Sequence, residues 1–197
     1  MILYEVGSGL YVNLTNRCTN SCDFCIRVQK DGYYGDLWLE SEPDADMIIK
    51  ELADFDLSKY TELVFCGYGE PTLRLDTLLE VAKYVKSVSD ITVRINTNGH
   101  ANLIYGYDVT PELDGVIDEV SISLNTADAV SYQKICHCEF GEDAYSSLLE
   151  FASLAKSHVK KVMLSVVKTT IPDEDIEKCQ EIADKCGVLL KVREFIN

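Results

Sequence analysis

Three cysteines stand close together in one polar segment near the start of the chain. Residues 15–25 read TNRCTNSCDFC, which places Cys18, Cys22 and Cys25 at the spacing C-x3-C-x2-C. Cysteine thiolates are the usual ligands of iron–sulfur clusters, and a [4Fe–4S] cluster normally takes four of them. Three cysteines in one loop therefore predict a cluster with one iron that no protein side chain binds. Catalytic metal sites need such an open position, whereas structural sites are closed.

Two other interpretations of these cysteines are a zinc site and three thiols with no common ligand. Zinc takes four ligands, and no fourth Cys or His follows nearby, because His100 is distant in the sequence. The chain has eight cysteines and no export signal, so a disulfide framework is not expected in a reducing compartment. Metal or redox chemistry is the better interpretation.

A glycine-rich polar segment follows a later apolar run. Residues 64–72 read VFCGYGEPT and contain Gly69 and Glu70. A carboxylate and exposed carbonyl groups suit an ammonium group, and glycine permits a close approach of the backbone. The alternative is an ordinary turn with a surface glutamate.

Hydroxyl and amide side chains end the next two apolar runs. Residues 94–99 read RINTNG, with Thr97 and Asn98, and residues 121–126 read SISLNT, with Ser123 and Asn125. Such groups can hydrogen-bond a ribose diol or a carboxylate. Lys168, near the end of a fifth run, is a candidate for binding a carboxylate. The alternatives are turn chemistry for the hydroxyl and amide groups and a solvated strand end for Lys168.

Apolar runs rich in Val, Ile and Leu alternate with amphipathic segments along the chain. The predicted strands are Leu10–Leu14, Glu62–Cys66, Thr92–Asn96, Glu119–Leu124, Val162–Val167 and Leu189–Phe195. The predicted helices are Ala45–Phe55, Leu75–Lys86, Glu142–Ser157 and Asp173–Cys186, with a short helix at Pro111–Ile117. Asp44 and Gly187 are suitable caps at the start of the first helix and the end of the last long one.

This alternation predicts an α/β fold. Strands separated by helices form parallel sheets from right-handed β-α-β units. Six strands are too few to close an eight-stranded barrel, so we expect a partial (βα)6 barrel with parallel strands. Residues 1–197 are expected to form a single domain. Chemistry in such folds lies at the carboxyl ends of the strands, and every motif above falls there.

The cysteine spacing, with the aromatic Phe24 before the last cysteine, resembles the signature of the radical S-adenosylmethionine (SAM) superfamily. The resemblance implies a [4Fe–4S] cluster on Cys18, Cys22 and Cys25, and SAM on the open iron. It also implies a 5′-deoxyadenosyl radical and an external electron donor of the flavodoxin or ferredoxin type. Phe24 would contact adenine.

The resemblance extends to the other polar motifs. Gly69 and Glu70 match a Gly-Gly-Glu-Pro-like element that binds the cofactor's amino group, although Tyr68 replaces the first of the motif's two glycines. The cofactor's ribose and carboxylate would be bound by the strand-end groups, namely Thr97, Asn98, Ser123, Asn125 and Lys168.

Residues 35–40 and 192–196 are similar to small TatD-associated radical SAM enzymes, a group that resembles queuine lyase. That resemblance implies cleavage of queuine at a carbon–nitrogen bond to 7-aminomethyl-7-deazaguanine. Trp38 would stack on the base, Glu40 or Glu42 would accept hydrogen bonds from its guanine-like edge, and Arg193 would reach the site. The alternatives are a loop anchor in the core for Trp38 and a solvated acidic face for the two glutamates.

Composition limits the choice of partner. The net charge of −15 opposes binding of a nucleic-acid polymer and favours a small-molecule substrate. No apolar run reaches the roughly 18 residues of a membrane-spanning helix, so no membrane contact and a cytoplasmic location are expected.

Three other functions fit the same motifs. They are a glycyl-radical activating enzyme, an enzyme like 7-carboxy-7-deazaguanine synthase, and an iron–sulfur electron-transfer protein. The electron-transfer protein is disfavoured because it has no use for cofactor-binding strand ends. The segment Cys136-His137-Cys138 leaves a second metal site open.

Overall fold

The structure, a computed structural model, describes residues 1–28 and 36–194. Its centre is a seven-stranded sheet in the order β1-β2-β3-β4-β5-β6-β7. The β1–β2 pair is antiparallel, and every pairing from β2 to β7 is parallel. The strands are β1 (Leu3–Val6), β2 (Gly9–Val12), β3 (Glu62–Phe65), β4 (Thr92–Thr97), β5 (Glu119–Ser123), β6 (Lys161–Val167) and β7 (Leu189–Arg193). The six parallel strands confirm the predicted α/β partial barrel.

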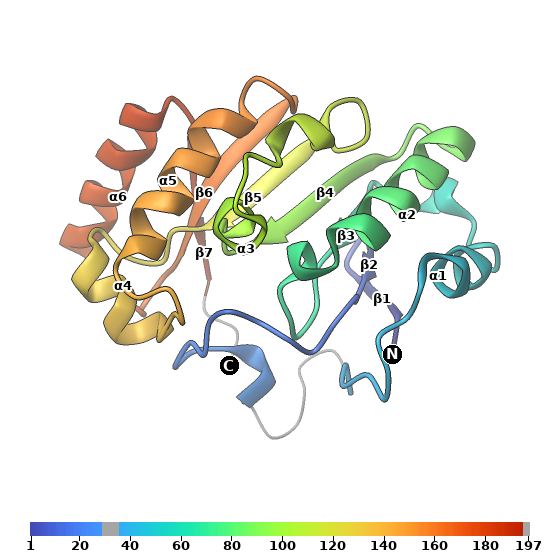
Figure 1. The fold of residues 1–197 in the computed structure, drawn as a ribbon, viewed down its shortest axis with the longest axis horizontal. Coiled ribbons are helices and arrows are strands. Elements are labelled where there is room, and N and C mark those ends of the chain that lie inside the picture. The colour runs from blue at the N-terminus through green and yellow to red at the C-terminus, as the bar shows by residue number, and fades with distance from the viewer. Residues whose placement is uncertain (29–35, 195–197) are drawn as a thin grey trace.

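Helices cover the outer face of this curved sheet (Figure 1). The α-helices are α1 (Ala45–Leu52), α2 (Leu75–Val88), α3 (Ala101–Tyr105), α4 (Ala129–Cys136), α5 (Asp143–Ala155) and α6 (Asp173–Cys186). Short 3-10 helices are η1 (Ile26–Val28), η2 (Leu57–Lys59), η3 (Pro71–Arg74) and η4 (Thr110–Leu113). Within the described ranges, no helix combines the length and the apolar character required to cross a membrane.

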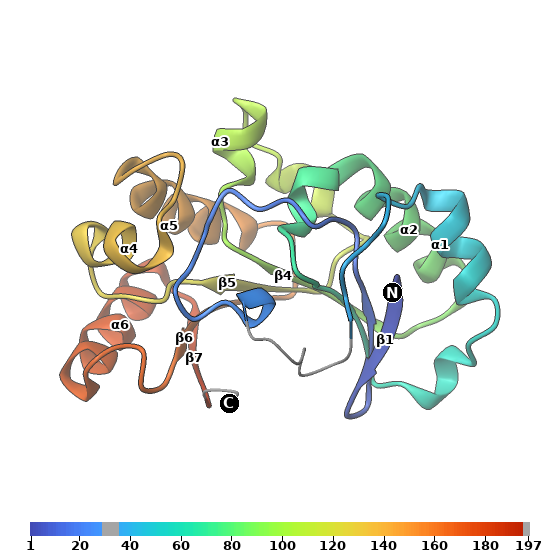
Figure 2. The ribbon, with the colours of Figure 1, turned by 90° about the horizontal axis from the view of Figure 1, so that it is seen from below.

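The two faces of the strands differ in character. Residues such as Leu63, Val93 and Ile122 point toward the helices and belong to the main apolar core. Because successive side chains alternate, the other face carries Asn96 and Ser123. Figure 2 shows the segment after β2, which contains the cysteines, passing in front of the sheet, and this segment completes a site at the carboxyl ends of the strands.

Some elements differ from the prediction. The strand β1 was missed because its four residues are too few for a recognisable pattern; Gly7, with φ +58°, supplies the turn that pairs it with β2. The helices α3 and α4 were also missed, and the expected helix Pro111–Ile117 is the 3-10 helix η4. Phe195, the predicted end of the last strand, lies outside the described residues. The caps at Asp44 and Gly187 are confirmed.

Candidate functional site

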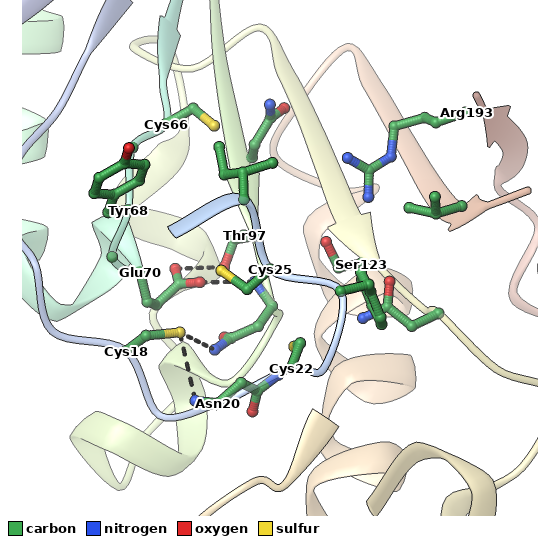
Figure 3. Close-up of a pocket in the computed structure, with 18 of the residues that line it drawn as sticks. Cys18, Asn20, Cys22, Cys25, Cys66, Tyr68, Glu70, Thr97, Ser123 and Arg193 are labelled. Atoms are coloured by element: carbon green, nitrogen blue, oxygen red, sulfur yellow. Dashed lines mark hydrogen bonds between the residues drawn. The ribbon is translucent and has the colours of Figure 1, made fainter. Parts of the chain in front are cut away.

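The cysteine segment and the carboxyl ends of the strands line one pocket (Figure 3). The predicted site residues in its lining are Cys18, Cys22, Phe24, Cys25, Gly69, Glu70, Thr97, Asn98, Ser123, Asn125 and Arg193. The lining also includes residues that the sequence analysis did not select, among them Asn20, Cys66, Tyr68 and Asn96. Cys66, Tyr68 and Asn96 lie at or just after strand ends, and Asn20 stands between two of the predicted ligand cysteines. These positions were the available signal, but polar residues occur at many such positions.

The three predicted cluster ligands share this pocket. Burial raises the pKa of Cys18 to about 12 and also raises the pKa of Cys25, while a hydrogen bond with Cys136 is the main cause that raises the pKa of Cys22. In the described ranges, no three His, Cys, Asp or Glu side chains are placed to hold a single metal ion. A four-iron cluster binds each thiolate at a separate iron, so its ligands need not converge on one point.

The end of α4 holds the cysteine segment in place. The backbone N–H groups of Ser21 and Asp23 donate to the carbonyls of Cys136 (2.9 Å) and Ile135 (3.0 Å). The His137 Nε2 lies 2.7 Å from Asp23 Oδ1. The last carbonyl groups of a helix have no hydrogen-bond donor within the helix, and these contacts supply one. They also fix the middle of the cysteine segment.

The side chains of Cys136, His137 and Cys138 point to different neighbours. Cys136 hydrogen-bonds Cys22, His137 pairs with Asp23, and the Cys138 sulfur lies 3.7 Å from His100 Nδ1. Three divergent side chains do not surround one ion. The segment therefore supports the cysteine loop, and in the structure its three side chains are not gathered around one point.

The Glu70 carboxylate is committed to protein donors. It accepts hydrogen bonds from the Thr72 N–H (3.0 Å), the Thr72 hydroxyl (2.7 Å), the Thr97 hydroxyl (2.7 Å) and the Asn98 N–H (2.7 Å). Glu70 is only 3% exposed, and burial raises its pKa while these hydrogen bonds lower it. Its carboxylate therefore braces the segment after β3 against the end of β4.

The backbone of Gly69 lies against the cysteine segment. A Cβ atom there would stand 2.3 Å from the Thr15 carbonyl oxygen and 2.4 Å from the Arg17 carbonyl oxygen. The Glu70 N–H donates to the Arg17 carbonyl at 2.8 Å. Glycine is required here because two backbone segments meet at this position.

A buried polar network extends from Glu70 toward α4. The Asn98 amide donates to the Thr19 hydroxyl at 2.7 Å, and that hydroxyl lies 3.3 Å from His100 Nδ1. On its other side, His100 Nε2 lies 3.2 Å from the Tyr132 hydroxyl, which accepts a hydrogen bond from Asn20 at 2.9 Å. Burial lowers the pKa of His100 to about 4, so its ring is neutral at pH 7.

Other polar atoms of the pocket have no protein partner. The buried Oδ1 atoms of Asn20 and Asn125 accept no hydrogen bond in the described part of the chain. Asn125 also adopts φ 62°, a left-handed conformation that costs energy for most residues. Unsatisfied acceptors beside three thiols fit a ligand that brings hydroxyl and ammonium donors, as the ribose and amino groups of SAM do.

Four predicted residues do not line the pocket. Trp38 is 50% exposed and packs edge-on against Tyr68, which does line it. Glu40 is exposed, and Lys168 is exposed with its Nζ 3.5 Å from Glu194.

Glu42 is held outside the pocket by ion pairs. Its carboxylate binds Arg17 at 2.7 Å and Arg74 at 3.1 Å. The hydrogen bond from Arg17 is the main cause that lowers the pKa of Glu42 to about 2.

The open parallel barrel and its three-thiol pocket define the class of an iron–sulfur enzyme. The sequence profile of the radical SAM superfamily matches residues 12–185, and the chain belongs to this superfamily. Its cofactors are a [4Fe–4S] cluster and SAM.

Individual relatives carry different names. A Methanococcus maripaludis protein named "Probable GTP 3′,8-cyclase" is 25% identical over 188 residues, which cover 94% of this chain and 58% of that protein. A candidate glycyl-radical enzyme activating enzyme of Methanocaldococcus jannaschii is 26% identical, over 90% of this chain and 69% of that protein. The chain thus spans little more than half the length of the cyclase relative.

Solved structures share the fold. Streptococcus suis SuiB bound to SAM aligns with a TM-score of 0.67 at 18% identity, over 96% of this chain and 39% of that one. The hydrogenase maturase HydG of Carboxydothermus hydrogenoformans aligns with a TM-score of 0.68 at 15% identity, over 95% of this chain and 44% of that one.

Proposed function

We propose that this chain cleaves SAM reductively and directs the resulting radical at a small-molecule substrate. Cys18, Cys22 and Cys25 would hold the cluster, which when reduced supplies the electron that releases a 5′-deoxyadenosyl radical from SAM. The single observation that carries the proposal is that these three thiols share a pocket with unsatisfied acceptors. We treat residues 1–197 as one radical SAM core.

The chain's own residues would bind and orient the cofactor. The backbone at Gly67–Gly69 would accept from the amino group, and Phe24 would contact adenine. The Asn125 Oδ1 and the Ser123 hydroxyl would hydrogen-bond the ribose or carboxylate. Thr97 and Asn98 would act mainly through Glu70 and Thr19, to which their side chains are bonded. Holding the cofactor rigidly is the protein's task, because the cofactor supplies the reactive species.

Lys168 would contact the cofactor's carboxylate only after a movement that breaks its pairing with Glu194.

The external electron donor is proposed to be a flavodoxin or a ferredoxin-like protein. Reduction must occur before the radical forms.

The substrate prediction from the sequence is queuine, cleaved to 7-aminomethyl-7-deazaguanine. Trp38, Glu40, Glu42 and Arg193 were its predicted contacts, and Arg193 is the one that lines the pocket. The names of the relatives refer instead to glycyl-radical activation, which is one of the alternatives above, and to GTP cyclisation, which is a further candidate. A synthase that makes a 7-deazapurine also stays a candidate.

The test starts with anaerobic reconstitution of the full chain. The product should bind about four irons and release 5′-deoxyadenosine from SAM when reduced with dithionite. Cys18→Ala, Cys22→Ala and Cys25→Ala should each lose the cluster. Cys179→Ala, which changes a buried cysteine on α6 outside the pocket, should keep it. A full cluster in the triple variant would reject the proposal.

Substrate assignment needs a separate assay. Queuine, GTP and a peptide carrying a glycyl-radical loop are incubated with active enzyme, and the products are identified by mass spectrometry. Absence of 7-aminomethyl-7-deazaguanine from enzyme that still forms 5′-deoxyadenosine would reject queuine alone.

A further inference from the structure

One cation of the pocket has no protein counter-charge. Arg193 ends β7 and lines the pocket, and its buried Nε has no hydrogen-bond partner in the described ranges. Its guanidinium forms no ion pair with the described carboxylates, although five N–H donors are available on such a group. Figure 3 shows this side chain reaching toward the middle of the pocket, opposite Cys66 and Tyr68.

Nearby charges do not neutralise Arg193. Glu194 also lines the pocket, but its carboxylate is the partner of Lys168 at 3.5 Å. The Glu62 carboxylate, on the same inner face, is already paired with Arg94 at 2.7 Å, and Arg94 also donates to the Asn96 Oδ1 at 2.7 Å.

A second cation of β7 lies outside the lining of the site pocket. Lys191 lies two residues before Arg193 on β7, and it too forms no ion pair with the described carboxylates. Burial lowers the pKa of Lys191, and the neighbouring positive charges of Arg94 and Arg193 lower it further. Lys191 is exposed and shares a separate hollow with Glu62 and Glu119, whereas Arg193 is the one Lys or Arg in the described lining of the site pocket.

An unpaired, largely buried cation is costly to keep in a folded protein, since desolvation penalises it and no partner compensates. Such a group is typical of a binding site that is completed by its ligand. We propose that the inner part of the pocket binds an anionic group of the substrate, a carboxylate or a phosphate, on the guanidinium of Arg193. The planar guanidinium can bind either group with two parallel hydrogen bonds.

This inference rests on the proposed function and narrows its substrate class. Queuine carries a secondary amine that is protonated near neutral pH, and an ammonium group would be repelled by Arg193. Substrates with a carboxylate or phosphate fit better. The methionine carboxylate of SAM is the other anion that enters this pocket, so the experiment must separate the two sources.

The test uses reconstituted enzyme saturated with SAM, titrated in a calorimeter with inorganic phosphate and with acetate. At least one of these anions should bind, and Arg193→Gln should weaken that binding by about tenfold or more. Arg193→Lys keeps the charge but loses the two parallel hydrogen bonds, so it should weaken anion binding less than Arg193→Gln does. Lys83→Gln removes an exposed cation from α2 and is the matched control, without effect on anion binding.

Three readouts decide the result. The Kd of SAM should change by less than about twofold in Arg193→Gln. The bound anion should raise the melting temperature of the unmodified enzyme and leave that of Arg193→Gln unchanged. Iron content should stay normal in both proteins, and Arg193→Met repeats the titration should the glutamine variant fail to fold.

Several outcomes would overturn the inference. They are equal anion binding by Arg193→Gln and the unmodified enzyme, no anion binding by either, or a loss of SAM affinity that matches the loss of anion affinity. That last result would place the cofactor's carboxylate on Arg193. Failure of the unmodified enzyme to form 5′-deoxyadenosine would instead reject the proposed function, and it is measured independently.

Discussion

Glu70 accepts four hydrogen bonds from Thr72, Thr97 and Asn98, and these bonds define its role at the scale of a single residue. A carboxylate can accept all four because it has no donor of its own. The residue was selected from the sequence as a direct ligand of an ammonium group. In the structure its carboxylate is held by these protein donors, and a contact with the cofactor's ammonium group stays a prediction.

Glu70→Gln should therefore destabilise the protein even without cofactor. The new amide would point its N–H₂ group at donors, leaving buried groups unsatisfied at a cost of about 1–3 kcal/mol. Urea denaturation of cluster-free protein measures this change. Glu80→Gln, an exposed position on α2, is the control, and equal stability of the two variants would contradict the bracing role.

His100 gives a pH-dependent prediction. Burial lowers its pKa from the ordinary 6.5 to about 4, so between these values the unfolded chain binds a proton that the folded chain does not. The contribution of neutral His100 to the free energy of unfolding is fully present above about pH 6.5 and decreases as the pH falls toward 4. Between about pH 7.5 and pH 5 the loss due to His100 should be about 2 kcal/mol.

The measurement compares urea denaturation of unmodified protein and His100→Gln at both pH values. The variant should lose less stability on acidification, by roughly this amount. His158→Gln, on the segment after α5, should behave like the unmodified protein. The same slope in His100→Gln and the unmodified protein would show that other groups control the acid response.

At the scale of elements, the contact between the cysteine segment and the segment after β3 depends on Gly69. Gly69→Ala would place a Cβ against two carbonyl oxygens that belong to backbone and cannot rotate away. We expect the variant to lose iron on reconstitution and to unfold at a lower temperature.

Gly141→Ala is the matched control for this prediction. Gly141 has φ +64° but no atom within 4 Å of the added Cβ, so only local strain of about 1–2 kcal/mol is expected. Its iron content should stay normal. Full iron incorporation by Gly69→Ala would show that the two segments can separate without harm.

Sequence patterns predicted the elements that carry long periodic signals. The helix Asp173–Cys186 was predicted with its bounds, and the six parallel strands were all located. The helix α4 was missed because its apolar positions are few and its buried residues are Tyr132 and Cys136. The function of α4 in holding the cysteine segment depends on backbone hydrogen bonds, which leave no trace in side-chain patterns.

The site was predictable to the extent that spacing and strand ends define it. The three cysteines line one pocket with the strand-end residues Thr97, Asn98, Ser123 and Asn125, whereas the strand-end residue Lys168 does not. What could not be predicted is which polar atoms are already bonded to each other. From the sequence, Thr97 and Asn98 cannot be told apart from residues whose side chains are free to bind a ligand. Only the fold reveals that the Thr97 hydroxyl donates to Glu70 and that the Asn98 amide donates to Thr19.

At the scale of the whole molecule, the distribution of charge is uneven. The net charge is −15, while Lys191 and Arg193 on the inner face lack acidic partners among the described residues. Among the described acidic residues only Glu70 and Asp118 are buried, so the excess negative charge lies near the surface, where it repels itself and opposes compaction. Ionic strength should screen this repulsion, because the Debye length falls to about 10 Å at 0.1 M salt.

The melting temperature should consequently rise as NaCl increases from about 0.02 to 0.2 M, which shortens the screening length from over 20 Å to below 10 Å. Ion pairs such as Arg17–Glu42 are largely exposed and contribute little, so their screening should not cancel the gain. Scanning calorimetry of cluster-free protein measures the shift, and KCl at the same ionic strength should reproduce it. Sucrose at matched osmolarity controls for general solvent effects, since it leaves the Debye length unchanged. A melting temperature that falls with salt would mean that attractive ion pairs outweigh the self-repulsion, and the acidic surface would then be organised into stabilising networks.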